Sequence, residues 1–276
     1  MSRLTIKQFK QKKRVGKKIA MLTAYDYAFA KIIDEACVDA ILVGDSLANV
    51  VLGLDSTKDV TMDQMIYHAK AVSRGAKNAL VIGDMPFEAY QKNPKHAVKN
   101  ARRFIKEGGC HGVKIEWFSK CLFVVKNIIA VGIPVMGHIG LTPQTAEALG
   151  GFKVQGKDAD SARNIIDQAV ALEKMGCFSL VLECVPDKVA RLITKKIKIP
   201  TIGIGAGPWC DGQILVMHDV FGLFDRFRPK FTKQYVDAGT LIKHAAQNYC
   251  KDVSSGKFPS KKQSFAITDE EFKQLR

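Results

Sequence analysis

Short apolar runs that end in a polar or charged side chain recur along this chain. Runs of this kind cover residues 41–44, 80–83, 113–115, 134–137 and 180–182. The residues that follow them are Asp45 with Ser46, Asp84, Glu116, His138 and Glu183. Strands of a buried parallel sheet are covered on both faces, so they form continuous apolar runs of this type. The pattern therefore predicts parallel strands whose C-terminal ends carry these polar groups.

Helical segments alternate with the predicted strands. Strands are expected at residues 19–25, 40–44, 80–83, 113–115, 134–137, 178–182, 201–204 and 214–217, and helices at 28–38, 62–75, 94–108, 119–131, 160–175 and 186–197. Asn93 before Pro94 matches a helix N-cap followed by a first-turn proline. The alternation predicts an α/β fold, a single (β/α)8 barrel of the TIM type with residues 1–276 as one domain. In such barrels the active site lies at the C-terminal ends of the strands.

Three segments fall outside this alternation. Residues 1–18 form a basic N-terminal leader, and residues 239–276 form a C-terminal helix, expected at 241–253, with a polar tail. The tail is expected to pack on the outside of the barrel or on a neighbouring subunit. Residues 141–157 are too long for an ordinary turn between a strand and a helix, so we expect a loop that folds over the barrel mouth.

Composition narrows the class of protein. The length of 276 residues suits one barrel, which typically has about 250 residues. No uninterrupted apolar segment approaches the roughly 18 residues of a membrane helix, and the leader has no apolar core of a secretory signal. The seven cysteines form no CxxC pair and read as reduced thiols. These features indicate a cytoplasmic enzyme with no membrane partner.

The net charge of +15 raises the question of nucleic-acid binding. The lysines and arginines are spread along the chain, with local clusters at residues 10–18 and 195–198. No groove-entering motif accompanies them. We therefore expect no nucleic-acid partner and read the basic residues as solvated faces that attract anionic substrates. Retention on DNA at about 150 mM salt would be needed to support the opposite interpretation.

Asp45, Asp84 and Glu116 follow three consecutive predicted strands, and adjacent strands lie about 4.8 Å apart. Their carboxylates are therefore expected to converge. Oxygen ligands of this kind suit Mg²⁺, which also leaves positions for water and a bidentate substrate. Without a cation the three charges would repel one another. The alternative is that each carboxylate caps a helix or pairs with a nearby lysine.

Three further side chains are candidates for the chemistry. Lys114 lies two residues before Glu116 and so faces the same side of the strand, where it would bind a substrate carboxylate or form a Schiff base. His138 is placed to donate to a substrate oxygen, although a lone histidine is often structural. Glu183 is expected to project at the mouth as a general base for a carbon acid, with an ion pair to Lys114 as the alternative. The glycines at 203, 205 and 207 predict a tight turn that a ligand can approach closely, since they lack dinucleotide-binding spacing.

Several longer strings in the same order carry a resemblance to a known family. They are TAYDY at 23–27, LVGDSL at 42–47, DST at 55–57, VKIE at 113–116, GHIGLTPQ at 137–144, GGFKVQG at 150–156, LVLECVP at 180–186, IGIGAG at 202–207 and DGQILVMHD at 211–219. Together they resemble the ketopantoate hydroxymethyltransferase family over nearly the full chain. Ala48-Asn49 and the basic, aromatic segment 223–228 depart from the commoner pattern without removing a proposed ligand.

The resemblance implies a barrel of the phosphoenolpyruvate mutase/isocitrate lyase-like kind. It implies Mg²⁺ bound by Asp45, Asp84 and Glu116, a keto acid bound by Asp45, Ser46, Asp84, Lys114 and His138, and Glu183 as the proton acceptor. The implied substrates are 3-methyl-2-oxobutanoate and 5,10-methylenetetrahydrofolate, and the implied product is 2-dehydropantoate (ketopantoate), a precursor in pantothenate biosynthesis. Members are homo-oligomers, commonly homodecamers.

Two other enzyme classes stay open. Carbon–carbon lyases and mutases related to isocitrate lyase have a similar fold, but the lyases depend on a reactive cysteine loop and no KKCGH-like string occurs here. A Schiff-base aldolase using Lys114 would be trapped by borohydride with substrate, whereas inhibition by EDTA without trapping would support the metal route.

Overall fold

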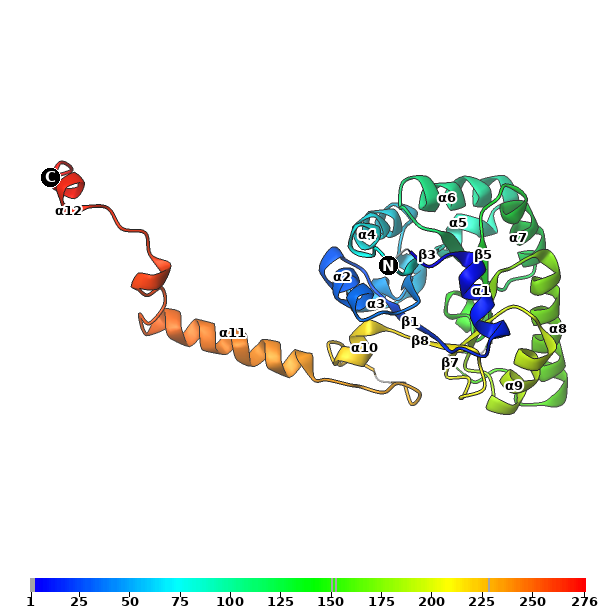
Figure 1. The fold of residues 1–276 in the computed structure, drawn as a ribbon. Coiled ribbons are helices and arrows are strands. Elements are labelled where there is room, and N and C mark those ends of the chain that lie inside the picture. The colour runs from blue at the N-terminus through cyan, green and yellow to red at the C-terminus, as the bar shows by residue number, and fades with distance from the viewer. Residues whose placement is uncertain (1–2, 150, 152, 228) are drawn as a thin grey trace.

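The closed barrel expected from the sequence is confirmed. The structure, a computed structural model, describes residues 3–149, 151, 153–227 and 229–276. Parallel strands β1 to β8 pair in chain order, and β8 returns to β1 (Figure 1). The strands are β1 Ile19–Thr23, β2 Ala40–Val43, β3 Leu80–Asp84, β4 Gly112–Glu116, β5 Val135–Gly140, β6 Ser179–Glu183, β7 Thr201–Ile204 and β8 Gly212–Leu215.

The alternation of side chains along each strand divides the core into two layers. In β2, Ile41 and Val43 point outward into the layer between strands and helices, and Ala40 and Leu42 point into the barrel. Every residue of β2, β3 and β4 is buried, since helices cover their outer faces. Continuous apolar runs are the sequence consequence of this double burial.

Helices follow most strands and form the outer wall. The longer ones are α2 Tyr27–Glu35, α4 Met62–Gly75, α6 Pro94–Lys106, α7 Cys121–Ala130, α8 Ala159–Met175 and α9 Asp187–Lys196. Asn93 caps α6 by accepting a hydrogen bond from the main-chain N–H of His96, which confirms the N-cap prediction. Shorter helices are α3 Leu47–Val50, α5 Phe87–Gln91, α10 Met217–Phe221 and α12 Asp269–Lys273, with 3-10 turns η1 Thr57–Asp59, η2 Pro143–Leu149 and η3 Lys261–Gln263.

The basic leader contains a helix that closes the N-terminal end of the barrel. This helix, α1, spans Ile6–Arg14 and begins with a Thr5 capping box. Its Phe9 is fully buried in the barrel interior and meets Phe178 edge-on, with ring centroids 5.8 Å apart. Lys13 forms an ion pair with Asp211 at 2.9 Å. The leader therefore belongs to the barrel's packing.

The outer wall is incomplete beside β7, β8 and β1. Residues 205–211 join β7 to β8 without a helix, and β8 is followed by the short α10. Ala20 of β1 and Gln213 of β8 are consequently exposed. A long helix that could cover such a face, α11 (Ala238–Ser254), instead points away from the barrel (Figure 1).

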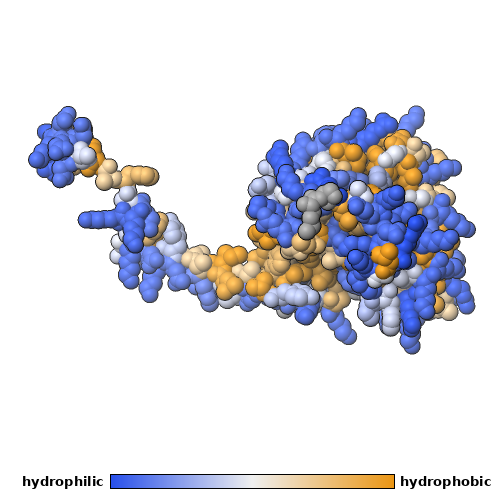
Figure 2. Space-filling view, in the orientation of Figure 1, coloured by the Kyte–Doolittle hydropathy of each residue, from blue (hydrophilic) through white to orange (hydrophobic). Residues whose placement is uncertain are grey.

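The segment from α11 to Arg276, here called the arm, has no buried residue. Its exposed apolar side chains include Leu241, Ile242, Tyr249 and Phe265. Figure 2 shows hydrophobic surface where the arm leaves the barrel. Of the two positions expected for the tail, packing on the outside of its own barrel is not found, because residues 240–276 are all exposed. Among the helices of the described chain, none combines the length and apolar composition needed to cross a lipid bilayer.

Candidate active site

The strand register brings the predicted polar residues to one end of the barrel. Main-chain pairing sets Asp84 of β3 beside Lys114 of β4, and Glu116 of β4 beside His138 of β5. Because Val113 and Ile115 point outward into the helix layer, Lys114 and Glu116 point inward. The prediction that Lys114 and Glu116 face the same side of β4 is confirmed.

Asp45 and Ser46 lie in the turn between β2 and α3. The Asp45 main-chain N–H donates to Asp84 Oδ2 at 3.1 Å, which draws the two acidic residues together. Ser46 stands at the N-cap position of α3 without capping it; its Oγ lies 2.8 Å from the hydroxyl of Tyr25. Burial raises the pKa of Tyr25, so this hydroxyl stays neutral and able to donate.

Lys114 is the cation at the centre of the cluster. Its ammonium forms an ion pair with Asp84 Oδ1 at 2.8 Å and lies 3.2 Å from His138 Nδ1 and 3.9 Å from Glu116 Oε1. Burial opposes its charge, but Asp84, Glu116 and Asp45 outweigh burial and raise the pKa of Lys114. A raised pKa keeps the amine protonated, and a protonated amine cannot attack a carbonyl as a Schiff-base aldolase requires.

His138 connects this cluster to Glu183. Its Nε2 lies 3.1 Å from Glu183 Oε2, and its Nδ1 lies 3.4 Å from Glu116 Oε1. Burial and the nearby Lys114 oppose protonation, but the contacts with Glu116 and Glu183 prevail and raise the pKa of His138 to about 9. Glu183 is the most exposed of these side chains, at 15%, and it contacts His138 instead of Lys114. Its carboxylate therefore meets the cavity on one side and a histidine on the other.

The main chain holds Glu183 closely. Gly140 of β5 pairs with Glu183 and has φ of +92°, and a Cβ at Gly140 would lie 2.3 Å from the Glu183 carbonyl oxygen. Only glycine fits this approach. Directly after Glu183, Cys184 has φ of 48°, an uncommon conformation for a residue with a side chain, and it turns the chain away from the strand.

The buried carboxylates carry an electrostatic cost. Burial, reinforced by Asp45 and Glu116, outweighs the attraction of Lys114 and raises the pKa of Asp84 to about 8. Burial also raises the pKa of Glu116. One lysine therefore does not neutralise the cluster, and a further cation would stabilise the ionised forms.

Gln144, which sequence reasoning missed, braces two of these carboxylates. Its side-chain amide donates to Asp45 Oδ2 at 2.9 Å and to the Met85 carbonyl at 3.1 Å, and its main-chain N–H donates to Glu116 Oε2 at 3.1 Å. Its own Oε1 accepts from the Tyr90 hydroxyl at 2.5 Å. The residue is fully buried. The one signal was its place at the end of the GHIGLTPQ string, since an uncharged amide predicts no chemistry.

The donor set fits a hard divalent cation. Gln144 occupies one oxygen of Asp45 and one of Glu116. Glu116 Oε1 is buried and accepts no hydrogen bond within the described chain, and Asp84 Oδ1 faces the Lys114 ammonium at 2.8 Å. No three acidic, histidine or cysteine side chains among the described residues stand in a ready-made ligand arrangement. The Lys114 ammonium lies among them instead, 2.8 Å from Asp84 Oδ1 and 3.9 Å from Glu116 Oε1. Oxygen-only donors suit Mg²⁺.

These groups line a cavity of about 560 Å³ at the barrel mouth. Leu141, Pro143, Ala146 and Gly151 of the predicted mouth loop also line it, so the loop does lie over the site. Gly150 and Phe152 of that loop, and Arg228 of the basic segment 223–228, lie outside the described residues. The opposite wall is largely apolar.

The glycine-rich turn after β7 is approached by side chains of this chain. A Cβ at Gly205 would lie 2.7 Å from the ring of Phe231, and one at Gly207 would lie 2.5 Å from Cβ of Asp187. The turn is tight, as predicted, and the close neighbours that the structure describes are Phe231 and Asp187.

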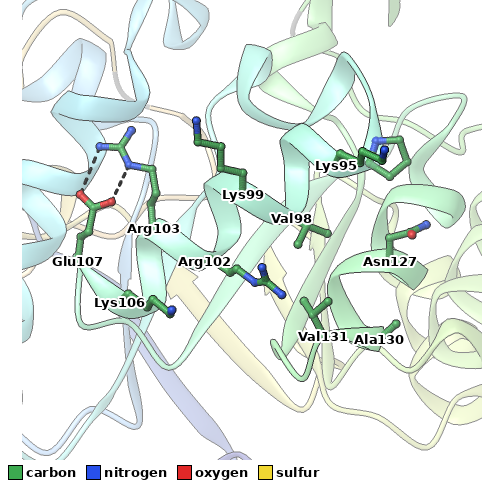
Figure 3. A pocket seen from close by; sticks show the side chains of 11 residues that line it. Lys95, Val98, Lys99, Arg102, Arg103, Lys106, Glu107, Asn127, Ala130 and Val131 are labelled. Atoms are coloured by element: carbon green, nitrogen blue, oxygen red, sulfur yellow. Dashed lines mark hydrogen bonds and ion pairs between the residues drawn. The ribbon is translucent and has the colours of Figure 1, made fainter.

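A separate basic groove of about 570 Å³ lies on the outer wall between α6 and α7 (Figure 3). It is lined by Lys95, Lys99, Arg102 and Lys106, and Arg103 pairs with Glu107 beside it, with Nε 2.9 Å from Oε1. Among the described residues it shares no lining residue with the mouth cavity. It is a solvated basic face, as expected from the dispersed charge.

A closed parallel barrel whose strand ends carry buried carboxylates, a lysine, a histidine and a glutamate defines an enzyme of the β/α-barrel class. The sequence matches the family ketopantoate hydroxymethyltransferase over residues 3–261, and the chain belongs to that family. It is 52% identical over 268 residues to the 3-methyl-2-oxobutanoate hydroxymethyltransferase of Heliobacterium modesticaldum, covering 97% of each chain. It is 54% identical to the enzyme of that name from Clostridium beijerinckii, covering 98% of each.

Solved structures support the fold. A phosphonopyruvate hydrolase in complex with oxalate and Mg²⁺ superposes with a TM-score of 0.62 at 12% identity, covering 99% of this chain and 95% of that one. A 2,3-dimethylmalate lyase, a member of the PEP mutase/isocitrate lyase superfamily, gives 0.58 at 14% identity, covering 99% and 94%. These structures share the fold of the barrel described above.

Proposed function

We propose that this enzyme transfers a hydroxymethyl group from 5,10-methylenetetrahydrofolate to 3-methyl-2-oxobutanoate and so forms 2-dehydropantoate. The observation that carries the proposal is the contact of Glu183 with His138 at the edge of the buried carboxylate cluster, in a member of this family. A carboxylate placed there is suited to remove a proton from carbon beside a carbonyl.

In this proposal Asp45, Asp84 and Glu116 hold Mg²⁺. When bound, the ion polarises the keto group of the substrate and offsets negative charge as the enolate forms. Lys114 and His138 hold the carboxylate and keto ends of the keto acid, with Asp45, Ser46 and Asp84 beside them. The pKa values of Asp84 and Glu116 are raised because these oxygen donors are buried away from water and lie close to other carboxylates.

Glu183 then removes the proton from C3 of the keto acid. The methylene carbon of the donor is bonded to two folate nitrogens, N5 and N10. The enolate carbon forms a bond to this carbon as one C–N bond breaks, and water then displaces the second nitrogen and supplies the hydroxyl group. The two released nitrogens take up the proton from C3 and one proton of the water. His138, beside Glu183, compensates charge on the carboxylate before it accepts the proton. The Gly140 contact limits movement of Glu183 along the strand.

The test is exchange of the C3 proton of 3-methyl-2-oxobutanoate, followed by proton NMR in D₂O with enzyme and Mg²⁺ and without folate. Metal-dependent exchange that EDTA abolishes supports the enolate step. Formation of 2-dehydropantoate on adding methylenetetrahydrofolate then supports the one-carbon donor. A folded, Mg²⁺-loaded enzyme that neither exchanges the proton nor forms product would overturn the proposal.

The Gln144 brace leads to a prediction for metal affinity. Gln144→Ala is expected to raise the Kd of Mg²⁺ about 10- to 100-fold, because outer-shell partners of metal ligands commonly have effects of that size. Isothermal titration with Mg²⁺ measures it. Gln213→Ala is the matched control, since this amide bonds the Gly207 carbonyl outside the mouth. If folded Gln144→Ala bound Mg²⁺ with unchanged affinity, the hydrogen bonds of Gln144 would have no role in metal binding.

We also propose that the enzyme is a homo-oligomer, with a decamer as the expected size. Support comes from the exposed residues on the outer faces of β8 and β1 and from an arm whose residues 240–276 are all exposed. Leu241, Ala245, Tyr249 and Val253 recur every four residues and form an apolar stripe on α11. Such a stripe is stable in water when another surface covers it.

Placing a charge on this stripe is expected to dissociate the assembly. For Leu241→Asp with Tyr249→Asp, light scattering after size exclusion should show a smaller species than the unmodified protein. Lys243→Asp on the same helix is the control and should leave the size unchanged. An unmodified protein that is monomeric at micromolar concentration would contradict the proposal.

A cytoplasmic location is proposed on the state of the cysteines. All seven cysteines are free thiols. Four of them are buried, Cys184 is partly buried, and Cys37 and Cys250 are exposed. Free thiols of this kind persist in a reducing compartment.

A further inference from the structure

The mouth cavity has a second half that the proposed keto-acid chemistry does not use. It lies at the ends of β8 and β1, next to the end of β2 that carries Asp45, and belongs to the same cavity as Glu183. Its walls are mostly apolar: Ile214, Leu215, Val216 and Phe231. A lining of this kind suits a flat, largely apolar ring, with polar groups needed at few points.

One carboxylate, that of Asp219, stands among these apolar residues. Asp219 belongs to α10 and is 9% exposed. The start of α10 is tied to β1, because the Met217 main-chain N–H donates to Thr23 Oγ1 at 3.0 Å. Asp219 lies near enough to Tyr25 to add to the rise in that residue's pKa. A carboxylate accepts about four hydrogen bonds, so one held within the protein can still serve a ligand.

The aromatic wall of this half is fixed by the glycine turn after β7. Phe231 lines the cavity, and its ring lies against the Gly205 backbone, where a Cβ would come within 2.7 Å of the ring. Gly205 has φ of +65°, which glycine adopts without strain. The close approach at this turn therefore places an aromatic ring on the cavity wall.

We propose that this half of the cavity binds the pterin ring of the folate donor, with Asp219 pairing the edge that carries the ring N–H and the 2-amino group. That edge presents two adjacent donors, which match the two oxygens of one carboxylate. Phe231 and the apolar residues bury the faces of the ring. This assignment rests on the proposed function, because it gives the one-carbon donor a place beside Glu183.

The rim of the same half suits the rest of the donor. Lys230 is exposed and lines the cavity next to Phe231 in sequence. A folate carries its anionic glutamate at the end opposite the pterin. With the pterin edge at the buried Asp219, that glutamate extends toward the cationic rim, where the net charge of +15 further favours an anion.

The experiment separates the two substrates. Asp219→Asn keeps the shape of the side chain but replaces one carboxylate oxygen with an NH₂ group. The pterin edge, with its ring N–H and 2-amino donors, then loses one of its two acceptors. We expect the KM for methylenetetrahydrofolate to rise at least about tenfold, because the edge loses a charge-assisted pair. Metal-dependent C3 exchange of the keto acid without folate should stay within about twofold of the unmodified enzyme. Binding of 6-methyltetrahydropterin, a probe without the glutamate, should weaken in parallel.

Asp55→Asn is the matched control. Asp55 lines the rim of the same cavity with a fully exposed side chain, so the same charge is removed without touching the buried wall. Its folate KM should be unchanged. Phe231→Leu is a second variant, for use if Asp219→Asn does not fold, and it should also weaken pterin binding with C3 exchange intact.

Unchanged folate KM in Asp219→Asn with intact exchange would overturn the assignment. Loss of C3 exchange in folded Asp219→Asn would also overturn it, since Asp219 would then belong to the keto-acid half. If the unmodified enzyme used no folate, the proposed function itself would be wrong. This result is distinguishable from failure of the Asp219 assignment, because it is obtained before any variant is made.

Discussion

Replacing Glu183 with glutamine is expected to slow C3 proton exchange of 3-methyl-2-oxobutanoate by about 10²- to 10⁴-fold, the usual contribution of a general base. Glutamine has nearly the shape of glutamate and can still contact His138, but it has no basic oxygen to take the proton. Binding of Mg²⁺ and of the keto acid should persist, because Glu183 lies at the edge of the cluster and not between Asp84 and Lys114.

Proton NMR in D₂O measures the exchange, and isothermal titration measures both binding steps in the same variant. Glu35→Gln is a suitable control, since Glu35 is exposed and pairs with Lys31 on α2. Exchange at the unmodified rate in Glu183→Gln would assign the base elsewhere. Loss of keto-acid binding together with exchange would place Glu183 in substrate binding and not in proton transfer.

Replacing Lys114 with methionine is expected to destabilise the metal-free enzyme by about 3–5 kcal/mol, the range for breaking a buried ion pair from one side. Asp84 would lose its partner at 2.8 Å, and Glu116 would lose a cation 3.9 Å away. Mg²⁺ should restore part of this loss, because it supplies positive charge to the same carboxylates. Activity should be lost, as the keto acid would have no buried ammonium to meet.

Urea unfolding with and without Mg²⁺ measures the first effect. Lys31→Met is the control: its ion pair with Glu35 is exposed, so little change is expected. Unchanged unfolding of metal-free Lys114→Met would mean that the carboxylates avoid the cost by taking up protons. A loss of stability that Mg²⁺ does not reduce would argue against metal binding at this cluster.

The sequence predicted the parts of the site that depend on strand periodicity. Asp84, Glu116 and Glu183 follow apolar runs, and a parallel barrel brings all strand ends to one face. The shared parity of Lys114 and Glu116 on β4 also follows from the two-residue period alone. The positions of charged groups were therefore predictable before any contact was known.

Features without a periodic or charged signature were not predictable. In the sequence of α1, the single buried residue Phe9 stands among basic residues, so the segment resembles a solvated leader. Gln144 is neutral, and its role depends on hydrogen bonds to Asp45 and Glu116 from a different loop. The direction of α11, which points away from the barrel, has no signal in its local sequence. Each of these is decided by tertiary contacts and not by local pattern.

Gln144 belongs both to the loop over the mouth and to the brace on Asp45 and Glu116, and this links two equilibria. If the closed position of the loop raises the affinity of those carboxylates for a cation, then a bound cation must favour the closed position by the same factor. Occupancy of the carboxylates and closure of the mouth are thereby thermodynamically coupled.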